Sequence, residues 1–553
     1  MSVRSSAVIR AEPDAYDVAR EKLMGRQAAG HGFLRAAVQA RGDQPVHGLA
    51  TTTGGAKGFA GIVHGIDPTA TVNPIPYDQL ARVGDIGVLY LADLTLATHA
   101  RLRLRTGPGA FSLCGVTHTT ASGAAMDEIV DLLREPVMPW DALVCTTSAV
   151  VETVRRVHEA EVDYLRWRFG PDVRVEVPQL PIIPLGVHCA DFEIAPEARL
   201  AARANLGLSP ETVTALFVGR LVYHAKAHPF ALYRGLQAAA ERTGQPVALL
   251  MCGWAPNEAI SQAFVGGAAQ FAPDVKTIFV EGRDPARRDE AWAAADIFVS
   301  LSDNIQETFG LTPIEAMAAG LPVVATDWNG YRDTVRAGID GYRVRTWAPG
   351  PSMGAAIARS YEFGGLNYDN YCWASAAPTA VDLEELADVL CGLIENPDLR
   401  HRLGDAGRQH ARDRFDWPVV YRQYQDLWDD LNARRRAALA DPAVAARLQA
   451  APQAGAARLD PYHAFGHYPT EHIGPGTRLS LAPGATRERF TEISTHALFG
   501  KLPTPLGVLS ALFAALEPGE ITLTTAAIRL GSNVAVVARA TGVLAKMGLV
   551  RLR

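Results

Sequence analysis

Long apolar runs, clustered cysteines and lysine are all scarce in this sequence, and each scarcity excludes a class of protein. No uninterrupted apolar run approaches the ~18 residues of a membrane span, and the N-terminal residues lack the apolar segment of a secretory signal. The six cysteines are scattered without a C-x-x-C pair, which disfavours a zinc site and a compact disulfide framework. We therefore expect a protein of the reducing cytoplasm, and we leave open peripheral contact with the inner face of the membrane.

The charge balance gives no reason to expect nucleic acid as the main partner, because the formal net charge is -6. Segment 54–61 reads GGAKGFAG and lacks the G-x-x-x-x-G-K-[ST] pattern of a phosphate-binding P-loop. An anionic ligand would therefore need local basic groups elsewhere in the chain. Arginine supplies most of the positive charge, and lysine occurs only at Lys22, Lys57, Lys226, Lys276, Lys501 and Lys546.

The chain of 553 residues is long enough for two or three domains of roughly 100–200 residues each. Short apolar runs alternate with helical patterns, which is typical of βαβ units on a mainly parallel α/β sheet. The runs form two series, and each series predicts one Rossmann-like half. The expected strands are at 6–11, 85–92, 110–118 and 142–148 in the first series, and at 213–219, 246–253, 276–282, 296–302 and 322–327 in the second.

Turn-rich segments separate the parts of the chain. Residues 181–212 are rich in proline and lie between the two series, so we place a first domain at 1–194 and a second at 195–400. A helical pattern continues through 401–440 and is followed by a linker rich in alanine, proline and glycine. The remaining module, 455–553, has a helical or winged-helix-like pattern of helix, short strand or turn, two helices and a strand. Its last helix has few basic side chains, which favours protein interaction over DNA binding.

The segment QETFGLTPIEAMAAG places Glu307 and Glu315 eight positions apart between two apolar runs. It predicts a loop and a short helix, with Thr312 as the N-cap, Pro313 in the first turn and Gly320 just past the end. The loop and the helix N-terminus would lie at the carboxyl edge of a parallel sheet, where free amide groups bind anions. Glu315 could close a capping box with Thr312 or bind a ligand. Glu307 could be a solvated loop acid or a hydrogen-bond acceptor for a ligand.

Two cations are expected at the same sheet edge. In VTALFVGRLVYHAKAHPF a buried strand ends at Gly219, Arg220 follows at once, and Lys226 precedes the next helix. Arginine offers a planar fork and lysine a compact point charge, which together suit the two phosphates of a pyrophosphate. A glycosidase would instead need two carboxyl groups facing each other across a glycosidic bond. The pattern favours an anionic leaving group.

These motifs resemble the donor half of a known enzyme family. The order F-V-G-R-L, a lysine six positions later, and E-x-F-G-L-x-x-x-E-A-M-A-x-G-x-P-V-V-A-T are similar to GT-B glycosyltransferases of the retaining family 4 type, also called glycosyl transferases group 1. The resemblance runs from about Pro181 to about Leu431. It implies two Rossmann-like domains that face each other across a cleft, with the acceptor domain first. It also implies that the helices of 401–440 cross back onto that first domain.

The resemblance implies a role for each residue of the motifs. Arg220 and Lys226 would neutralise the diphosphate of a nucleotide sugar, Glu307 would bind hydroxyls of the transferred sugar, and Glu315 would hold the ribose hydroxyls. The sugar would leave as an oxocarbenium-like species, and the acceptor would attack from the same face. No metal or other cofactor is expected. The remaining donor-binding positions lie next to the arginine or after the first glutamate: Gly219, Phe309, Gly310, Leu311 and Thr312.

The signals in the first domain are weaker. In MGRQAAGHGFLRAA glycines open an expected helix, and the segment resembles the glycine-containing loop that approaches the donor phosphates in this superfamily. Gly30 is its candidate donor-binding residue, although an ordinary turn fits as well. His118 ends an expected strand and matches a family histidine near the reaction centre, with a structural role as the alternative. The sequence departs from the family at Asn329, where a second glycine is frequent, and at Asp333, where glutamate is usual.

The leading hypothesis is a cytoplasmic, retaining hexosyltransferase that uses a nucleotide sugar. Its acceptor would be a glycan, a lipid-linked molecule or a protein, and the module 455–553 would bind this acceptor or a protein partner. A nucleotide-sugar 2-epimerase on the same scaffold is one alternative, since it would convert the donor without any acceptor. A non-enzymatic regulator that senses sugar nucleotides is the other, and the intact set of cations and glutamates argues against it.

Overall fold

The computed structural model describes residues 6–19 and 25–553. The chain divides into two compact units, Met1–Gly455 and Ala456–Arg553. Met24, at the start of the glycine-containing segment of the first domain, lies outside the described residues. Within the described residues, no helix is both long enough and apolar enough to cross a bilayer.

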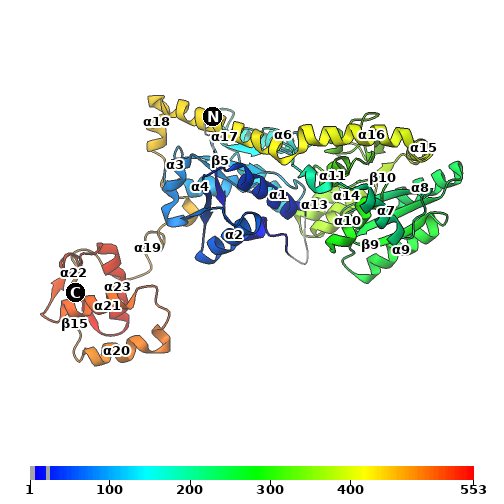
Figure 1. Ribbon diagram of the computed structural model, residues 1–553. Coiled ribbons are helices and arrows are strands. Elements are labelled where there is room, and N and C mark those ends of the chain that lie inside the picture. The colour runs from blue at the N-terminus through cyan, green and yellow to red at the C-terminus, as the bar shows by residue number, and fades with distance from the viewer. Residues whose placement is uncertain (1–5, 20–24) are drawn as a thin grey trace. The chain divides into compact units, whose positions relative to one another are not determined.

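The first unit contains two parallel sheets, each covered by helices (Figure 1). The first sheet has the strand order β3-β2-β1-β4-β5-β6. Its strands are β1 (Val8–Arg10), β2 (Val46–Ala50), β3 (Val72–Pro76), β4 (Val88–Tyr90), β5 (Ser112–Val116) and β6 (Ala142–Val144). Its helices are α1 (Gly25–Ala40), α2 (Thr53–Ile66), α3 (Val83–Ile86), α4 (Leu96–Arg103), α5 (Gly123–Asp131) and α6 (Ser148–Phe169).

Both faces of this first sheet are buried, as expected for parallel strands between helices. Cys114 and Val144 point into one apolar cluster, whereas their neighbours Leu113 and Leu143 point into another on the opposite face. The continuous apolar runs of β5 and β6 follow from this double burial, because each residue of the strand needs an apolar side chain whichever way it points.

The second sheet has the strand order β12-β11-β10-β7-β8-β9. Its strands are β7 (Val213–Val218), β8 (Val247–Gly253), β9 (Lys276–Glu281), β10 (Ile297–Ser300), β11 (Val323–Thr326) and β12 (Gly341–Val344). Its helices are α7 (Pro196–Asn205), α8 (Phe230–Thr243), α9 (Glu258–Phe271), α10 (Pro285–Ala294), α11 (Leu311–Ala319), α12 (Tyr331–Thr334), α15 (Leu383–Glu395) and α16 (Pro397–His410). Two Rossmann-like domains are thus present, and the predicted α/β fold class is confirmed.

Within the two parallel sheets, three of the described strands were not expected from the sequence: β2, β3 and β12. β3 reads VNPIP and β12 reads GYRV, and both lie at the edge of their sheets. Edge strands are only partly buried, so they do not need a continuous apolar run and can contain proline. β2 reads VHGLA, in which a histidine and a glycine interrupt the apolar pattern.

A long helix, α17 (Trp417–Leu439), returns the chain to the first domain after α16 (Figure 1). Trp417, Tyr424 and Trp428 are buried there and surround Phe33 of α1, with ring centroids 5.3–6.5 Å apart. The aromatic pattern at helical spacing therefore forms a core between α1, α17 and the first sheet. A short helix, α18 (Pro442–Gln449), follows, and its Arg447 pairs with Glu176 at 2.8 Å.

One segment of the second domain falls outside the regular alternation of strands and helices. Residues 346–381 form the antiparallel pair β13 (Thr346–Trp347) and β14 (Ala380–Val381), with α13 (Ala355–Glu362) and α14 (Tyr368–Ala376) between them. The sequence pattern after Tyr342 is helical and does not predict this strand pair. The strand pair closes this segment at its base, so it is an excursion from the sheet between β12 and α15.

The second unit has an apolar core of its own, made of residues between Leu479 and Val550. Its antiparallel sheet has the order β16-β15-β17. The elements are α19 (Pro461–Ala464), β15 (Arg478–Leu481), α20 (Arg487–Thr495), α21 (Leu506–Leu516), β16 (Ile521–Thr522), α22 (Leu523–Leu530), α23 (Val534–Lys546) and β17 (Val550–Leu552). The last five elements occur in the order expected for this module.

Candidate functional site

Helix α11 begins at Leu311, two residues earlier than the sequence predicted. Gly310 is its N-cap, with φ of 83° and no side-chain cap. A Cβ atom on Gly310 would lie 2.2 Å from the ring of Tyr331, so only glycine fits. The helix ends as expected at Gly320, in the left-handed conformation.

The observed start of α11 excludes the predicted capping box. Because Gly310 is the N-cap, Glu315 is the fifth helical residue, and a capping box requires the third. The prediction of Thr312 as the N-cap is wrong, and Glu315 is free of the structural role that competed with ligand binding. The first amide groups of α11, those of Leu311 and Thr312, have no acceptor within the helix.

Glu315 is half-buried, and no hydrogen bond to its carboxylate occurs among the described residues. Burial raises the pKa of Glu315 to about 7, although the charges of Arg288 and Lys226 oppose the increase. A carboxylate in this setting gains from any ligand that donates hydrogen bonds to it. A pair of ribose hydroxyls would be such a ligand.

Glu307 and Lys226 form an ion pair between Nζ and Oε2, with side-chain exposures of 12% and 23%. Burial acts to raise the pKa of Glu307, but the charge of Lys226, its hydrogen bond and the amide groups of Phe309 and Thr308 outweigh burial and hold it below its usual value. Glu307 is therefore an ionised acceptor at neutral pH. The pair brings together two residues that the sequence predicted to share one sheet edge.

Arg220 lies beside this pair, directly after β7. Its guanidinium donates to the side-chain oxygen of Gln306, the residue before Glu307, at 3.1 Å. The lysine loop is held to the same place, because Ser302 donates to the carbonyl of Lys226 at 3.2 Å. The two cations, the glutamate and the start of α11 thus gather at the carboxyl ends of β7 and β10.

Glycines at neighbouring strand ends let the backbones approach closely at this edge. A Cβ atom on Gly253, at the end of β8, would lie 1.9 Å from the carbonyl oxygen of Gly219, after β7. A Cβ atom on Gly282, after β9, would lie 2.8 Å from the Cα of Gly253. The sequence analysis singled out only Gly219. The common signal was a glycine directly at the end of the apolar runs that became β7, β8 and β9.

Two loops of the first domain contact this edge. Thr308 donates to the carbonyl of His118, and Thr147 donates to the carbonyl of Thr308 at 3.0 Å. The Nε2 atom of His118 lies 2.8 Å from the carbonyl oxygen of Ala92, and a carbonyl only accepts, so Nε2 carries the hydrogen. Burial lowers the pKa of His118, so the ring is neutral and Nδ1 is left as an acceptor.

The two departures from the family pattern have structural explanations. Asn329 has φ of 48°, a left-handed conformation that asparagine adopts more readily than most residues, and its side-chain amide donates to the carbonyl of Glu307. Asp333 accepts a hydrogen bond from the hydroxyl of Ser148 at 2.7 Å, which links the two domains. Asn329 thus holds this turn to the Glu307 loop, and Asp333 is used in a domain contact.

Gly30 does not lie in a loop. It is a buried residue inside α1, where a Cβ atom would lie 2.2 Å from the carbonyl oxygen of Ala15. Its visible function in the structure is close packing of α1 against the turn Pro13–Ala15. The helix expected for this segment is present as α1, with Gly30 inside it, and a phosphate contact by Gly30 stays a prediction.

The 346–381 segment adds aromatic residues that the sequence analysis missed. The hydroxyl of Tyr361 accepts from the amide of Gly123 in the first domain at 2.8 Å. The hydroxyl of Tyr368 lies 3.4 Å from that of Thr119, next to His118. The concentration of aromatic residues in YEFGGLNYDNYCW was the sequence feature that could have indicated them. The segment therefore spans from the second domain to the loop that carries His118.

Comparisons with known proteins match parts of this chain to glycosyltransferases. Residues 199–348 match the model of the family described as glycosyl transferases group 1. The matched range contains both cations, both glutamates and α11, and it ends where the 346–381 segment begins. The chain is 26% identical over 333 residues to a D-inositol 3-phosphate glycosyltransferase of Segniliparus rotundus, an alignment that covers 60% of this chain and 62% of that protein.

A second relative is the phosphatidyl-myo-inositol mannosyltransferase of Mycobacterium leprae, with 28% identity over 351 residues, 63% of this chain and 74% of that protein. Among solved structures, Alr3699/HepE of Anabaena in complex with UDP superposes with a TM-score of 0.51 and 15% identity, over 74% of this chain and 98% of that chain. This likeness supports the two-domain fold.

Proposed function

We propose that the chain, whose residues 199–348 match the glycosyl transferases group 1 model, transfers a sugar from a nucleotide-diphosphate sugar to an acceptor, with retention of configuration. The observation that carries this proposal is the placement of Arg220, Lys226 and Glu307 at the N-terminus of α11. Cations and free helix amides bind the oxygens of a diphosphate. A glutamate that is ionised, or that has no hydrogen-bond partner, accepts hydrogen bonds from hydroxyl groups of the sugar and ribose.

In the proposed complex, the donor takes over the Lys226–Glu307 pair. The diphosphate accepts from Lys226, Arg220 and the amides of Leu311 and Thr312, while Glu307 accepts from hydroxyls of the sugar. Glu315 accepts from the ribose. The Nδ1 atom of His118 faces a sugar hydroxyl as an acceptor. A group that is paired within the free protein thus exchanges that partner for one on the donor. A group without a partner gains one from the donor.

The proposed chemical step breaks the bond between the anomeric carbon and the phosphate oxygen, and the cations stabilise the charge that develops on that oxygen. The acceptor hydroxyl forms its new bond on the same face, and its proton passes to the departing phosphate. The residues present can perform these functions without a metal ion. Two relatives are named for inositol-containing acceptors, so inositol 3-phosphate and phosphatidylinositol belong in the acceptor panel.

The test is incubation of the full chain with UDP-, GDP- and ADP-sugars, with and without these acceptors and cell extract. Release of nucleoside diphosphate together with an α-linked product from an α-linked donor would support the proposal. Conversion of the donor to its 2-epimer without any acceptor would instead support the epimerase alternative. Binding of a sugar nucleotide without turnover in any mixture would favour the regulator.

A further inference from the structure

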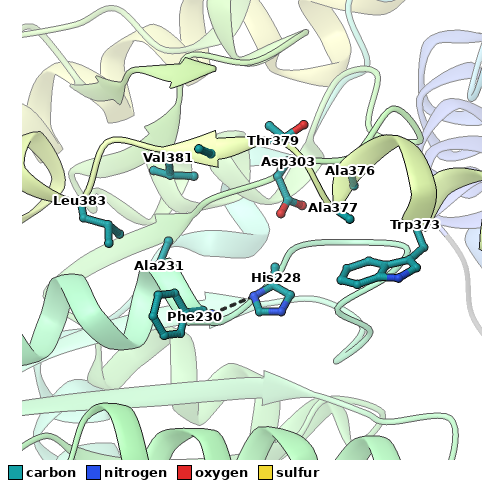
Figure 2. Close-up of a pocket in the computed structure, with 11 residues that line it drawn as sticks. His228, Phe230, Ala231, Asp303, Trp373, Ala376, Ala377, Thr379, Val381 and Leu383 are labelled. Atoms are coloured by element: carbon teal, nitrogen blue, oxygen red, sulfur yellow. Dashed lines mark hydrogen bonds between the residues drawn. The ribbon is translucent and has the colours of Figure 1, made fainter. Parts of the chain in front are cut away.

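A cavity of about 290 Å³ lies beside the candidate donor site, between the Lys226 loop and the 346–381 segment. Figure 2 shows His228 and Phe230, at the start of α8, on one side and Asp303, from the loop after β10, above them. Trp373 and Thr379 come from the 346–381 segment. Its volume is near the lower end of the range for small-molecule sites, which is roughly 300–1,000 Å³.

Two of the side chains that line this cavity have a buried polar atom without a partner. Asp303 is only 7% exposed, and its Oδ1 makes no hydrogen bond among the described residues. The Oγ1 atom of Thr379 is likewise buried and unpaired in the described part of the chain. Buried polar groups normally have partners, because leaving them unpaired is unfavourable. Two such atoms in one cavity indicate a ligand that hydrogen-bonds to both.

A third polar group of the cavity is a donor. The amide of Phe230 donates to Nδ1 of His228 at 3.3 Å, so Nε2 carries the hydrogen of the neutral ring. Burial lowers the pKa of His228, which keeps the ring neutral. The imidazole lies parallel to the indole of Trp373, with centroids 6.0 Å apart. The cavity thus offers a donor, an acceptor and a hydroxyl next to an aromatic surface.

The charges around the cavity limit the class of ligand. Lysine and arginine are absent from the residues that line it, so a phosphate or nucleotide would find no counter-charge. A cation is disfavoured as well, because α8 begins at Phe230 and the N-terminus of a helix carries partial positive charge. Burial raises the pKa of Asp303 to about 7, against the backbone amides of Asp303 itself and His228, so this carboxyl is only partly ionised at neutral pH.

We propose that this cavity binds a neutral polyhydroxylated molecule of about the size of a monosaccharide, at a site separate from the donor site. Hydroxyl groups of the ligand donate to Asp303 Oδ1 and pair with Thr379 Oγ1, and another accepts from His228 Nε2. Apolar C–H groups of the ligand lie against Trp373 and against the alanines that also line the cavity.

The site is connected to the lysine loop of the donor site. Asn304, the neighbour of Asp303, donates to the carbonyl of His224 at 3.0 Å, and Ser302 donates to that of Lys226. A bound polyol therefore joins the Lys226 loop to the 346–381 segment through direct contacts to both. It stabilises the arrangement of the loop that presents Lys226.

Calorimetric titration of the full chain with myo-inositol and with glucose tests this proposal. We expect saturable binding of at least one of them with a Kd of about 1 mM or lower. Thr379→Val removes one hydroxyl with little change of shape and should raise the Kd about fivefold to tenfold. Ala377→Trp, at an exposed position of the cavity, should abolish binding by filling it. Thr243→Val, at the other end of α8, is the matched control and should leave the Kd unchanged.

Glu307→Gln distinguishes the cavity from the donor site, since it should leave polyol binding intact. Absence of saturable binding of both probes would overturn the proposal, and the cavity would then hold water only. Binding that Thr379→Val leaves unchanged, or that Glu307→Gln abolishes, would place the polyol elsewhere and overturn it too. Tighter binding of inositol 3-phosphate that Ala377→Trp abolishes would overturn the neutral ligand class.

Discussion

Replacement of Lys226 by methionine separates the electrostatic function of this lysine from its contribution to the fold. The change removes the ammonium group but keeps an unbranched chain of similar length. It leaves the carboxylate of Glu307, 12% exposed, without its cation. The amide groups of Thr308 and Phe309 still hydrogen-bond to that carboxylate, which limits the penalty.

The expected loss of folding stability follows from the burial of the pair. Loss of one partner costs about 3–5 kcal/mol in a fully buried pair and about 0–1 kcal/mol at the surface, so we expect about 1–3 kcal/mol here at pH 7. The folded-state pKa of Glu307 is depressed from 4.5. The stabilisation by the Lys226–Glu307 pair is therefore present above pH ~4.5 and is lost as the pH falls through the folded-state pKa. The difference between wild type and Lys226→Met should therefore shrink in acid.

The double variant Lys226→Met with Glu307→Gln provides the critical comparison. It removes both charges, so most of the lost stability should return. Turnover of the nucleotide sugar should stay about 10²-fold to 10³-fold below wild type, because the cation that stabilises the leaving phosphate is still absent. Urea denaturation measures the stability, and release of nucleoside diphosphate measures the turnover. If turnover returned together with stability, or if Lys226→Met alone were nearly as active as wild type, Lys226 would have no electrostatic function in the reaction.

Three further predictions follow from the same geometry. Glu315→Gln should weaken binding of the free nucleoside diphosphate, whereas Glu307→Gln should weaken only the sugar-bearing donor; equal losses in calorimetry would contradict the assignment. Glu315 has a raised folded-state pKa, so it lowers stability as the pH rises from about 4.5 to about 7. Glu315→Gln should therefore stabilise the unliganded protein by about 1–3 kcal/mol at pH 8 and by much less at pH 4, as denaturation at the two pH values would show. A chain that ends at Gly455 should fold and turn over the donor, and lose efficiency only with its native acceptor or partner; insolubility of that chain would show that the second unit completes the fold. An end at Leu439 would remove α18 and its ion pair to Glu176 as well.

The parts of the fold that the sequence predicted are those with double burial. Strands β7, β8 and β10 are apolar at nearly every position because helices cover both faces, and their runs are visible without any partner. Strands β3 and β12 are edge strands whose pairing depends on a neighbour far away in the sequence. Their own sequences therefore do not identify them as strands.

The candidate site likewise contains residues whose meeting could be predicted from the sequence and residues whose contacts could not. The cations and glutamates lie in local motifs that a strand end or a helix start positions, so their meeting could be predicted from chain order alone. The contacts of Tyr361 and Tyr368 could not, because they join residues more than 200 positions apart across two domains. The start of α11 was misplaced because Thr312 is a better N-cap by type than Gly310. The backbone at Gly310 selected glycine instead, since Tyr331 leaves no room for a side chain.

A crystal structure of the full chain with a bound nucleotide sugar tests the central claim most directly. We predict that the pyrophosphate lies between Arg220, Lys226 and the first amides of α11. Lys226 should then have left Glu307 for the phosphate, with Glu307 on the sugar and Glu315 on the ribose. A donor bound elsewhere, or bound while Lys226 and Glu307 remain paired with each other, would contradict the account.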